Sequence, residues 1–329
     1  MLRKGIAIIL ACAVWLTGCG GGEAPASQEA ESPSSSQVQE APSSASEGEA
    51  PSSQTAGEEV PSVPPVPVEI PEYSDDPEAP LHPYLEELVQ GIAAEISQPG
   101  MSEYQRAKAA FDYMIRSTYL DEPIGLSLWR VHGGGEEPIP YLEQRALSPL
   151  RFGVGMCEDY AAALTLLLRG LGLEAEYVPG LTYSVEGHLV DHAWTAVRID
   201  GVWYHLDSQL EDNISRRGTV RYRYFLKGDA TMAGSHLWGQ RLIDAGLLTP
   251  EQNAEIAAHF LLPDCPEDYP APERYTFEEP PVPDLGALEA EAAGETAAWE
   301  AENGPLPEME LNTTPPVFGL GGYGPADEG

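Results

Sequence analysis

Residues 153–170 read GVGMCEDYAAALTLLLRG. Glycines that allow a tight turn precede a long apolar run, which predicts a helix over residues 157–169. Cys157 would begin this helix, where free backbone N–H groups and the helix dipole favour a thiolate and can hold an oxyanion. Glu158 and Asp159 oppose thiolate formation by their charge, so activation needs a further partner. On this segment alone, a nucleophile and a buried structural cysteine are equally good interpretations.

A downstream hairpin offers that partner. Asp200-Gly201 is a strong two-residue turn signal, and such a turn pairs residues whose numbers sum to 401. In this register His192 and Asp207 are diagonal neighbours on one face, whereas Asp191 points to the other face. A carboxylate placed in this way orients an imidazole that activates a thiol. The same register puts Gln209 opposite His192. The whole predicted face comprises His192, Trp194, Ala196, Arg198, Trp203, His205, Asp207 and Gln209.

The surrounding segments indicate an α+β domain with an antiparallel sheet, because helices come first and short strands follow. Apolar spacing predicts helices over residues 82–96 and 102–118, the second one capped by Ser102. Residues 121–150 are expected to be irregular. The expected strands span residues 173–179, 192–199, 202–207 and 222–226.

Three motifs follow one another in a fixed order. Residues 155–161 read GMCEDYA, residues 192–194 read HAW, and residues 200–207 read DGVWYHLD. This set resembles the Cys, His and Asp motifs of the transglutaminase-like superfamily, and the resemblance covers about residues 80–240. It implies a papain-like α+β core, in which the helix that carries the cysteine packs on an antiparallel sheet.

The resemblance also implies roles for single residues. Cys157 would be the nucleophile, His192 the general base and acid, and Asp207 the residue that orients the imidazole. The implied reaction is attack on an amide carbonyl, which gives a thioester that an amine or water resolves. The candidates for the substrate site are Trp194, Gln209 and His236. The second donor of the oxyanion hole stays open among Tyr119, Trp129 and Gln209.

A metal site is the competing interpretation of the histidines, and we expect neither metal nor cofactor. His188 and His192 are four residues apart, as in a helical zinc pair, but a β-type pattern follows His192. Cys265 is a lone thiol with no assigned role. A disulfide between Cys265 and Cys157 would abolish catalysis.

The N-terminus predicts export and lipid anchoring. A positive start and a short apolar stretch form a signal peptide over residues 1–18. Residues 16–19 read LTGC, which resembles the lipobox of bacterial lipoproteins and makes Cys19 the lipidated residue. The Ser-, Pro- and Glu-rich segment that completes residues 19–70 is an expected disordered tether. We therefore expect an extracytoplasmic protein that meets the membrane only through its lipid.

Charge is distributed unevenly along the 329 residues. The chain has 53 acidic and 17 Lys and Arg residues, a net charge of −36, which excludes most nucleic-acid binders. The predicted folded domain, residues 71–265, has 29 acidic and 14 basic residues. Residues 266–329 form an acidic, Pro-rich tail that we expect to be mostly disordered, with a helix near residues 285–302.

Two classes of function fit these observations. The first is a membrane-anchored cysteine enzyme that acts on peptides or proteins, for which the location suggests cell-wall peptides or extracellular proteins. The second is a binding or structural module that keeps the fold without turnover. An intact Cys, His and Asp set favours the enzyme. We expect a monomer in either case.

Overall fold

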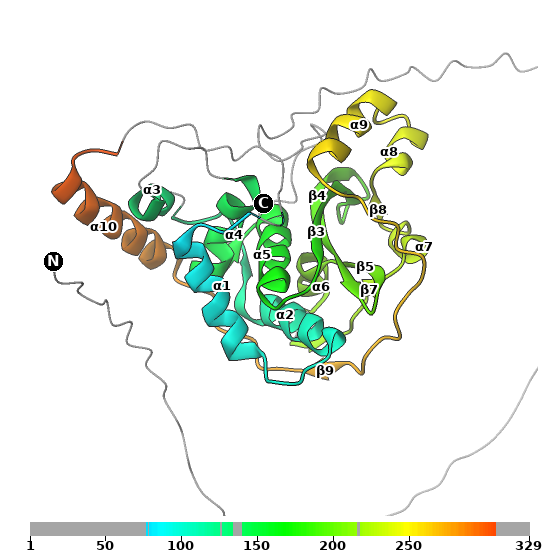
Figure 1. Cartoon of the computed structure of the whole chain (residues 1–329), viewed down its shortest axis with the longest axis horizontal. Coiled ribbons are helices and arrows are strands. Elements are labelled where there is room, and N and C mark those ends of the chain that lie inside the picture. The colour runs from blue at the N-terminus through cyan, green and yellow to red at the C-terminus, as the bar shows by residue number, and fades with distance from the viewer. Residues whose placement is uncertain (1–76, 78, 126, 134–139, 216–217, 307–329) are drawn as a thin grey trace, which may run out of the picture. The chain divides into compact units, whose positions relative to one another are not determined.

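The computed structural model describes residues 77, 79–125, 127–133, 140–215 and 218–306 (Figure 1). The chain divides into two compact units, residues 1–60 and 61–329, and every described residue belongs to the second. The predicted signal peptide, Cys19 and the tether lie outside the described residues. The helices are α1 (Pro83–Ile96), α2 (Glu103–Ser117), α3 (Leu128–Gly133), α4 (Tyr141–Phe152), α5 (Cys157–Gly170), α6 (Ser208–Ser215), α7 (Asp229–Met232), α8 (Gln240–Asp244), α9 (Pro250–His259) and α10 (Leu285–Asn303). The strands are β1 (Tyr119–Leu120), β2 (Val154–Gly155), β3 (Ala175–Tyr183), β4 (Leu189–Ile199), β5 (Val202–Leu206), β6 (Thr219–Val220), β7 (Phe225–Lys227), β8 (His236–Leu237) and β9 (Tyr275–Thr276).

A five-stranded antiparallel sheet of order β7-β5-β4-β3-β8 is the centre of the domain. The helix α5 packs on one face of it, against β3 and β4, and α1, α2 and α4 pack against α5 (Figure 1). The predicted fold class is thereby confirmed: the structure is α+β, and the helix that begins at Cys157 covers an antiparallel sheet. The side chains between α5 and the sheet form the main hydrophobic core.

The β4–β5 hairpin has the predicted register from Thr195–Leu206 to the turn. Its two faces bury different clusters, as the alternation of a strand requires. Val197 and Leu206 belong to the main core under α5, whereas Trp194 and Ala196 belong to a second, smaller cluster. One apolar set therefore positions the helix, and the other surrounds the predicted catalytic face.

The predicted pairing is wrong beyond Leu206. The strand β5 ends there and α6 begins at Ser208, so Gln209 lies in a helix and does not pair with His192. The cause is Asp207, because its Oδ1 accepts a hydrogen bond from the backbone N–H of Leu210 at 2.9 Å. An aspartate in this position caps the first turn of a helix and so ends the strand.

One segment of the domain contains more regular structure than its sequence predicts. Residues 121–150 include α3 and most of α4, although their pattern predicts irregular structure. Every residue of α4 from Tyr141 to Leu150 is buried, including the charged Glu143 and Arg145. These buried charges interrupt the apolar spacing by which a helix is detected in a sequence.

The tail also differs from the expected mostly disordered segment over residues 266–306. The helix α10 is close to the expected one, but β9 is a strand that the sequence does not predict, and it pairs with β6. Tyr269 and Tyr275 pack against the core of the domain. The high acidic content of the tail favours a prediction of disorder. The partial burial of these aromatic side chains stabilises an ordered conformation of the segment. Residues 307–329 lie outside the described part.

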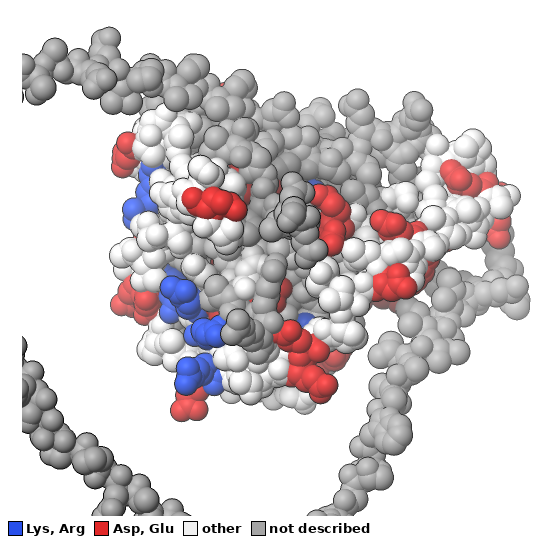
Figure 2. Space-filling model, turned by 180° about the vertical axis from the view of Figure 1, so that it is seen from behind, with Lys and Arg blue, Asp and Glu red and all other residues white. Residues whose placement is uncertain are grey.

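Charged side chains cover the surface unevenly. On the face shown in Figure 2, acidic side chains are spread widely and basic ones gather at one edge. Several cations are paired with carboxylates, for example Lys108 with Asp112 and Arg198 with Glu174. Among the described helices, none has the length and apolar character that crossing a bilayer would require.

Candidate active site

Cys157 is the first residue of α5, as its sequence context predicts. Gly153 has a φ of 68°, which ends α4 in the left-handed conformation that glycine adopts without strain. Gly155 lies against α5, since a Cβ there would be 2.6 Å from Cβ of Asp159. The Asp159 carboxylate in turn accepts a hydrogen bond from the backbone N–H of Met156 at 2.8 Å. The two glycines and this N-terminal cap together set where the thiol is presented.

The Cys157 thiol is fully buried and is held by an acidic neighbour. Its Sγ donates a hydrogen bond to Oε2 of Glu158 at 3.1 Å, and lies 4.0 Å from the carbonyl oxygen of Asp191. Burial raises the pKa of this thiol well above its usual value, and the Glu158 carboxylate raises it further. Arg145 opposes this effect. Burial and the acidic neighbour therefore both disfavour the thiolate in this conformation.

Arg145 of α4 balances the two carboxylates in the first turn of α5. Its Nε forms an ion pair with Oδ1 of Asp159 at 2.8 Å, and its Nη2 lies 3.5 Å from Oε2 of Glu158. Burial raises the pKa of Asp159 to about 7, even though Arg145 acts in the opposite direction. The expectation that Glu158 and Asp159 disfavour the thiolate agrees with these shifts.

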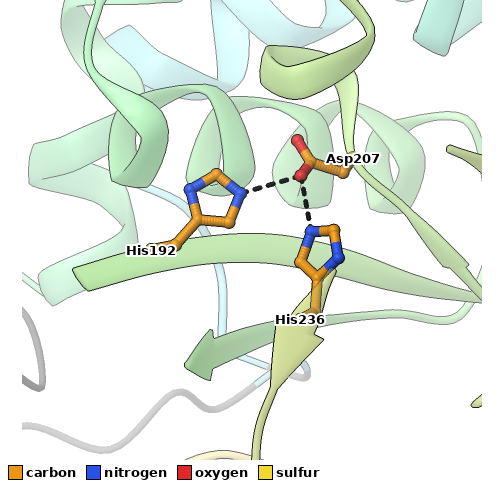
Figure 3. A group of neighbouring side chains, drawn as sticks. All are labelled: His192, Asp207 and His236. Carbon is orange, nitrogen blue, oxygen red and sulfur yellow. Dashed lines mark hydrogen bonds and ion pairs between the residues drawn. The ribbon is translucent and has the colours of Figure 1, made fainter. Parts of the chain in front are cut away.

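His192 and Asp207 meet on the same side of the hairpin, as its pattern predicts. The distance from Nε2 of His192 to Oδ2 of Asp207 is 2.7 Å, and both side chains are buried (Figure 3). Since an ionised carboxylate only accepts hydrogen bonds, Nε2 carries the proton and Nδ1 has the free lone pair. Nδ1 is buried and has no hydrogen-bond partner among the described residues. The imidazole is therefore in the tautomer that a general base requires.

His236 is a second ligand of the same carboxylate. Its Nε2 lies 2.9 Å from Oδ2 of Asp207, and its Nδ1 lies 2.9 Å from Oγ of Ser235 (Figure 3). Although burial alone would raise it, the pKa of Asp207 is held well below its usual range by His192 and His236. Burial lowers the pKa of His236 itself. The sequence marks His236 only as a candidate, because no register prediction connects β8 to this face.

Trp194 lies beside the His192 ring and is fixed by a separate pair. Its Nε1–H donates to Nδ1 of His205 at 3.0 Å, and Nε2 of His205 lies 2.9 Å from Oδ1 of Asp229. The Trp194 ring stacks at 6.0 Å from that of His192 and makes an edge contact at 4.7 Å with that of His236. The tryptophan therefore forms one wall of the site.

Two groups of the described residues could hold a metal by composition: His192, Asp207 and His236, and also His205, Asp229 and Cys265. The second group is in an unsuitable protonation state. An indole N–H can only donate, so Nδ1 of His205 is unprotonated and Nε2 carries the proton that a metal would have to replace. In the first group, the two Nε2 atoms donate to the carboxylate that would otherwise be a ligand. The hydrogen bonds fit an acid–base site better than a metal centre.

The other predicted residues fall in different places. Gln209 is buried in the first turn of α6 and lines a small crevice together with Cys157 and Asp207. Tyr119 is 38% exposed. The side chain of Trp129 lies outside the described part. Cys157 and Cys265 are both free thiols, so they form no disulfide in this structure.

One contact of a working triad is missing from this conformation. Among the described residues, no hydrogen bond joins Sγ of Cys157 to His192, because the thiol is bonded to Glu158. Catalytic contacts are often long in unliganded structures and shorten when substrate binds.

Similarity to known proteins is concentrated in the part of the chain that holds this site. Residues 90–208, which include Cys157, His192 and Asp207, match the family model of the transglutaminase-like superfamily. No curated protein matched the sequence.

Three of the solved structures that are similar to this chain overlap it in part. A candidate cysteine protease from Cytophaga hutchinsonii is 18% identical over 40% of this chain and 39% of its own, with a TM-score of 0.29. A TGase is 19% identical over 40% and 34%, with a TM-score of 0.27. Arylamine N-acetyltransferase C from Bacillus anthracis is 14% identical over 38% and 48%, with a TM-score of 0.26.

This chain spans less than half of the length of each of these structures. The match of residues 90–208 to the family model supports a cysteine-based activity at the level of the family. Residues 90–208 are therefore similar in sequence to the transglutaminase-like superfamily.

Proposed function

We propose that this protein is a cysteine-dependent enzyme that acts on amide bonds through a thioester, with Cys157, His192 and Asp207 as its catalytic residues. The observation that carries this proposal is the unpartnered Nδ1 of His192, in a ring whose opposite nitrogen is bound by a buried aspartate. A buried lone pair without a donor is costly, and a thiol that donates to it during catalysis explains why it is kept.

The chemistry follows from this tautomer. Nδ1 of His192 takes the thiol proton, and Sγ of Cys157 bonds to the amide carbonyl carbon. When the tetrahedral intermediate collapses, the C–N bond breaks, His192 returns the proton to the leaving amine, and a thioester remains. Water then gives hydrolysis or deamidation, and a second amine gives a crosslink. Asp207 stabilises the imidazolium and keeps the ring in place.

We also propose that the enzyme acts outside the cytoplasm, anchored by a lipid on Cys19. This rests on the sequence of residues 1–19. Peptides of the cell wall and extracellular proteins are the substrates that such a location offers. Loss of the Cys19→Ala variant from the membrane fraction of expressing cells would support the anchor, and its retention there would contradict it.

A second function has one observation in its favour. A buried thiol that donates to Glu158 is unreactive in this conformation, as a non-catalytic binding module would allow. Alkylation of the full chain by iodoacetamide, with mass spectrometry of each cysteine, separates the two proposals. The enzyme predicts labelling of Cys157 that is faster than that of Cys265 and at least tenfold slower in His192→Ala. Equal, slow labelling of both cysteines would support the module.

The reaction type needs substrates. Incubation of the full chain with glutamine-containing peptides, with and without an amine donor, separates cleavage, deamidation and crosslinking by product mass. The full chain is needed because Tyr269 and β9 lie beyond residue 265 and pack on the domain. A Cys157→Ala variant is the matched control, and it should abolish every product.

A further inference from the structure

The side-chain amide of Gln209 is buried and makes no hydrogen bond among the described residues. The residue is 1% exposed, and neither its Nε2 nor its Oε1 has a hydrogen-bond partner in the described structure. Leaving such a group unpaired costs the free energy of removing each polar atom from water without a replacement hydrogen bond. Native proteins rarely keep an unpaired buried amide, and those that are kept call for a reason.

The position of this amide gives the reason. Gln209 lines a small crevice between α5 and the β4–β5 hairpin, and Cys157 and Asp207 line the same crevice, which is too narrow for a water molecule in this conformation. Cys157 is also the first residue of α5, where backbone N–H groups have no acceptor within the helix. An unpaired side-chain donor and the N-terminal end of α5 thus border the same crevice as Cys157.

We propose that Nε2 of Gln209 is the side-chain donor of the oxyanion hole, together with the backbone N–H of Cys157. The inference rests on the proposed function. As Sγ bonds to the carbonyl carbon, the electron pair of the C=O bond moves to oxygen and the thiol proton moves to Nδ1 of His192. The Gln209 amide donates a hydrogen bond to that oxygen without losing its proton. Its stability cost in the free protein is recovered in the transition state, where catalysis needs it.

Tyr119, another candidate for this role, fits less well than Gln209. Tyr119 is more than one-third exposed, on a short strand that pairs with β2 rather than with the hairpin. The side chain of Trp129 is outside the described part. Of the two candidates whose side chains the structure describes, Gln209 combines burial, an unpaired donor and a place in the crevice that Cys157 also lines.

The test uses the full chain with p-nitrophenyl acetate, which acylates a reactive thiol and releases a coloured product. Gln209→Met keeps the length of the side chain and removes its hydrogen bonds. We expect acylation of Cys157 to fall roughly 10²–10³-fold, the size of effect seen when an oxyanion donor is lost. The rate of alkylation by iodoacetamide should stay within twofold, because that reaction forms no oxyanion. The melting temperature should be equal or higher, since an unpaired buried amide has been removed.

Acylation of Gln209→Met at the wild-type rate would overturn the role of Gln209. A parallel fall of the acylation rate, the alkylation rate and the melting temperature would also overturn it, because it would indicate a structural residue. Gln209→Glu places a carboxylate at the oxyanion and should be at least as impaired as Gln209→Met. The exposed Gln98→Met is the matched control and should behave as the wild type. Absence of acylation in the wild type itself would instead overturn the proposed function.

Discussion

The sheet carries two histidine–aspartate pairs, each with a cysteine nearby, and they differ at one ring nitrogen. In His192–Asp207 the distance is 2.7 Å and Nδ1 is unpartnered. In His205–Asp229 the distance is 2.9 Å and Nδ1 accepts the Trp194 indole N–H. The first imidazole can accept a proton, whereas the second already uses both nitrogens. The same residue types therefore leave one imidazole with a free nitrogen among the described residues and make the other a structural link.

The cysteines of the two groups differ in the same direction. Cys157 begins a helix and borders a crevice, while Cys265 lies in a loop with its Sγ 3.8 Å from the carbonyl oxygen of Pro263. Burial raises the pKa of both thiols, and an acidic neighbour adds to it in each case, Glu158 for Cys157 and Asp229 for Cys265. The thiol pKa in the resting state thus does not distinguish Cys157, the proposed nucleophile, from Cys265. The unpartnered Nδ1 of the nearby His192 does.

The largest expected effect comes from removing each imidazole in turn. His192→Ala should lower acylation by about 10⁴-fold or more, because the thiol loses its base. His205→Ala should lower it less than tenfold, and its main effect should be a loss of stability of about 1–3 kcal/mol from the unpaired Trp194 N–H. Burst kinetics and urea unfolding measure the two quantities. Comparable losses of acylation in both variants would show that the comparison is wrong.

The two aspartates should separate almost as strongly. Asp207→Asn places an amide against Nε2 of His192, which favours the tautomer with the proton on Nδ1 and removes the base. We expect acylation to fall roughly 10²–10⁴-fold. Asp229→Asn is the matched control on the other pair and should stay within tenfold of the wild type. A wild-type rate for Asp207→Asn, with the fold intact by circular dichroism, would exclude the assigned role of Asp207.

Glu158 should slow alkylation of Cys157 in the resting state, because it raises the pKa of the thiol. Glu158→Gln keeps a hydrogen-bond acceptor but removes the charge that raises the thiol pKa. A lower thiol pKa gives more thiolate when the pH lies below that pKa, so alkylation of Cys157 should be faster than in the wild type. Cys265 in the same molecule is the internal control. A slower reaction would indicate that Glu158 accepts the thiol proton instead of retaining it.

Acid should remove stabilising contributions from two groups of the site, His236 and Asp207. The pKa of His236 is lowered in the folded state and that of Asp207 is held well below its usual range. For both, the unfolded chain binds more protons between the folded and unfolded pKa, so the free energy of unfolding falls as pH falls through that window. The contribution of His236 should begin to fall below about pH 6.5 and that of Asp207 below about pH 4. Asp159, whose pKa is raised to about 7, acts in the opposite direction between about pH 7 and pH 4, so each contribution is measured as the difference between the wild type and the variant. Urea unfolding across pH should lose the first contribution in His236→Gln and the second in Asp207→Asn.

The parts of the site that follow local rules are predictable from the sequence. A two-residue turn fixes the register of its hairpin, so the turn signal alone puts His192 and Asp207 on one face. The helix start at Cys157 follows from its glycines. The prediction fails where a side chain ends the strand, because Asp207 acts as a helix cap as well as a ligand of imidazole. A residue with two roles gives only one signal in a sequence.

The remaining parts depend on contacts between distant segments. His236 lies on β8, and its place beside β3 is set by two paired residues that no local pattern announces. The bond between Trp194 and His205 follows from a correct register, but the part that Asp229 plays does not, because Asp229 begins α7 after a further strand. The unpaired state of Gln209 is visible only when every neighbour is known.

The smallest expected effect tests whether one indole N–H separates the two pairs. Trp194→Phe keeps an aromatic ring against His192 and removes the donor to Nδ1 of His205. Loss of one buried hydrogen bond predicts a stability decrease of about 1 kcal/mol. In the wild type, ¹⁵N NMR of the histidine rings should show the His205 proton on Nε2 alone. In Trp194→Phe the Nδ1–H tautomer should become detectable, since no donor then occupies that nitrogen. The His192 ring should keep its proton on Nε2 in both proteins, because Asp207 and not Trp194 holds it there. A wild-type His205 that already populates the Nδ1–H form would remove the distinction between the pairs, and the His205–Asp229–Cys265 group would again be a candidate for a metal.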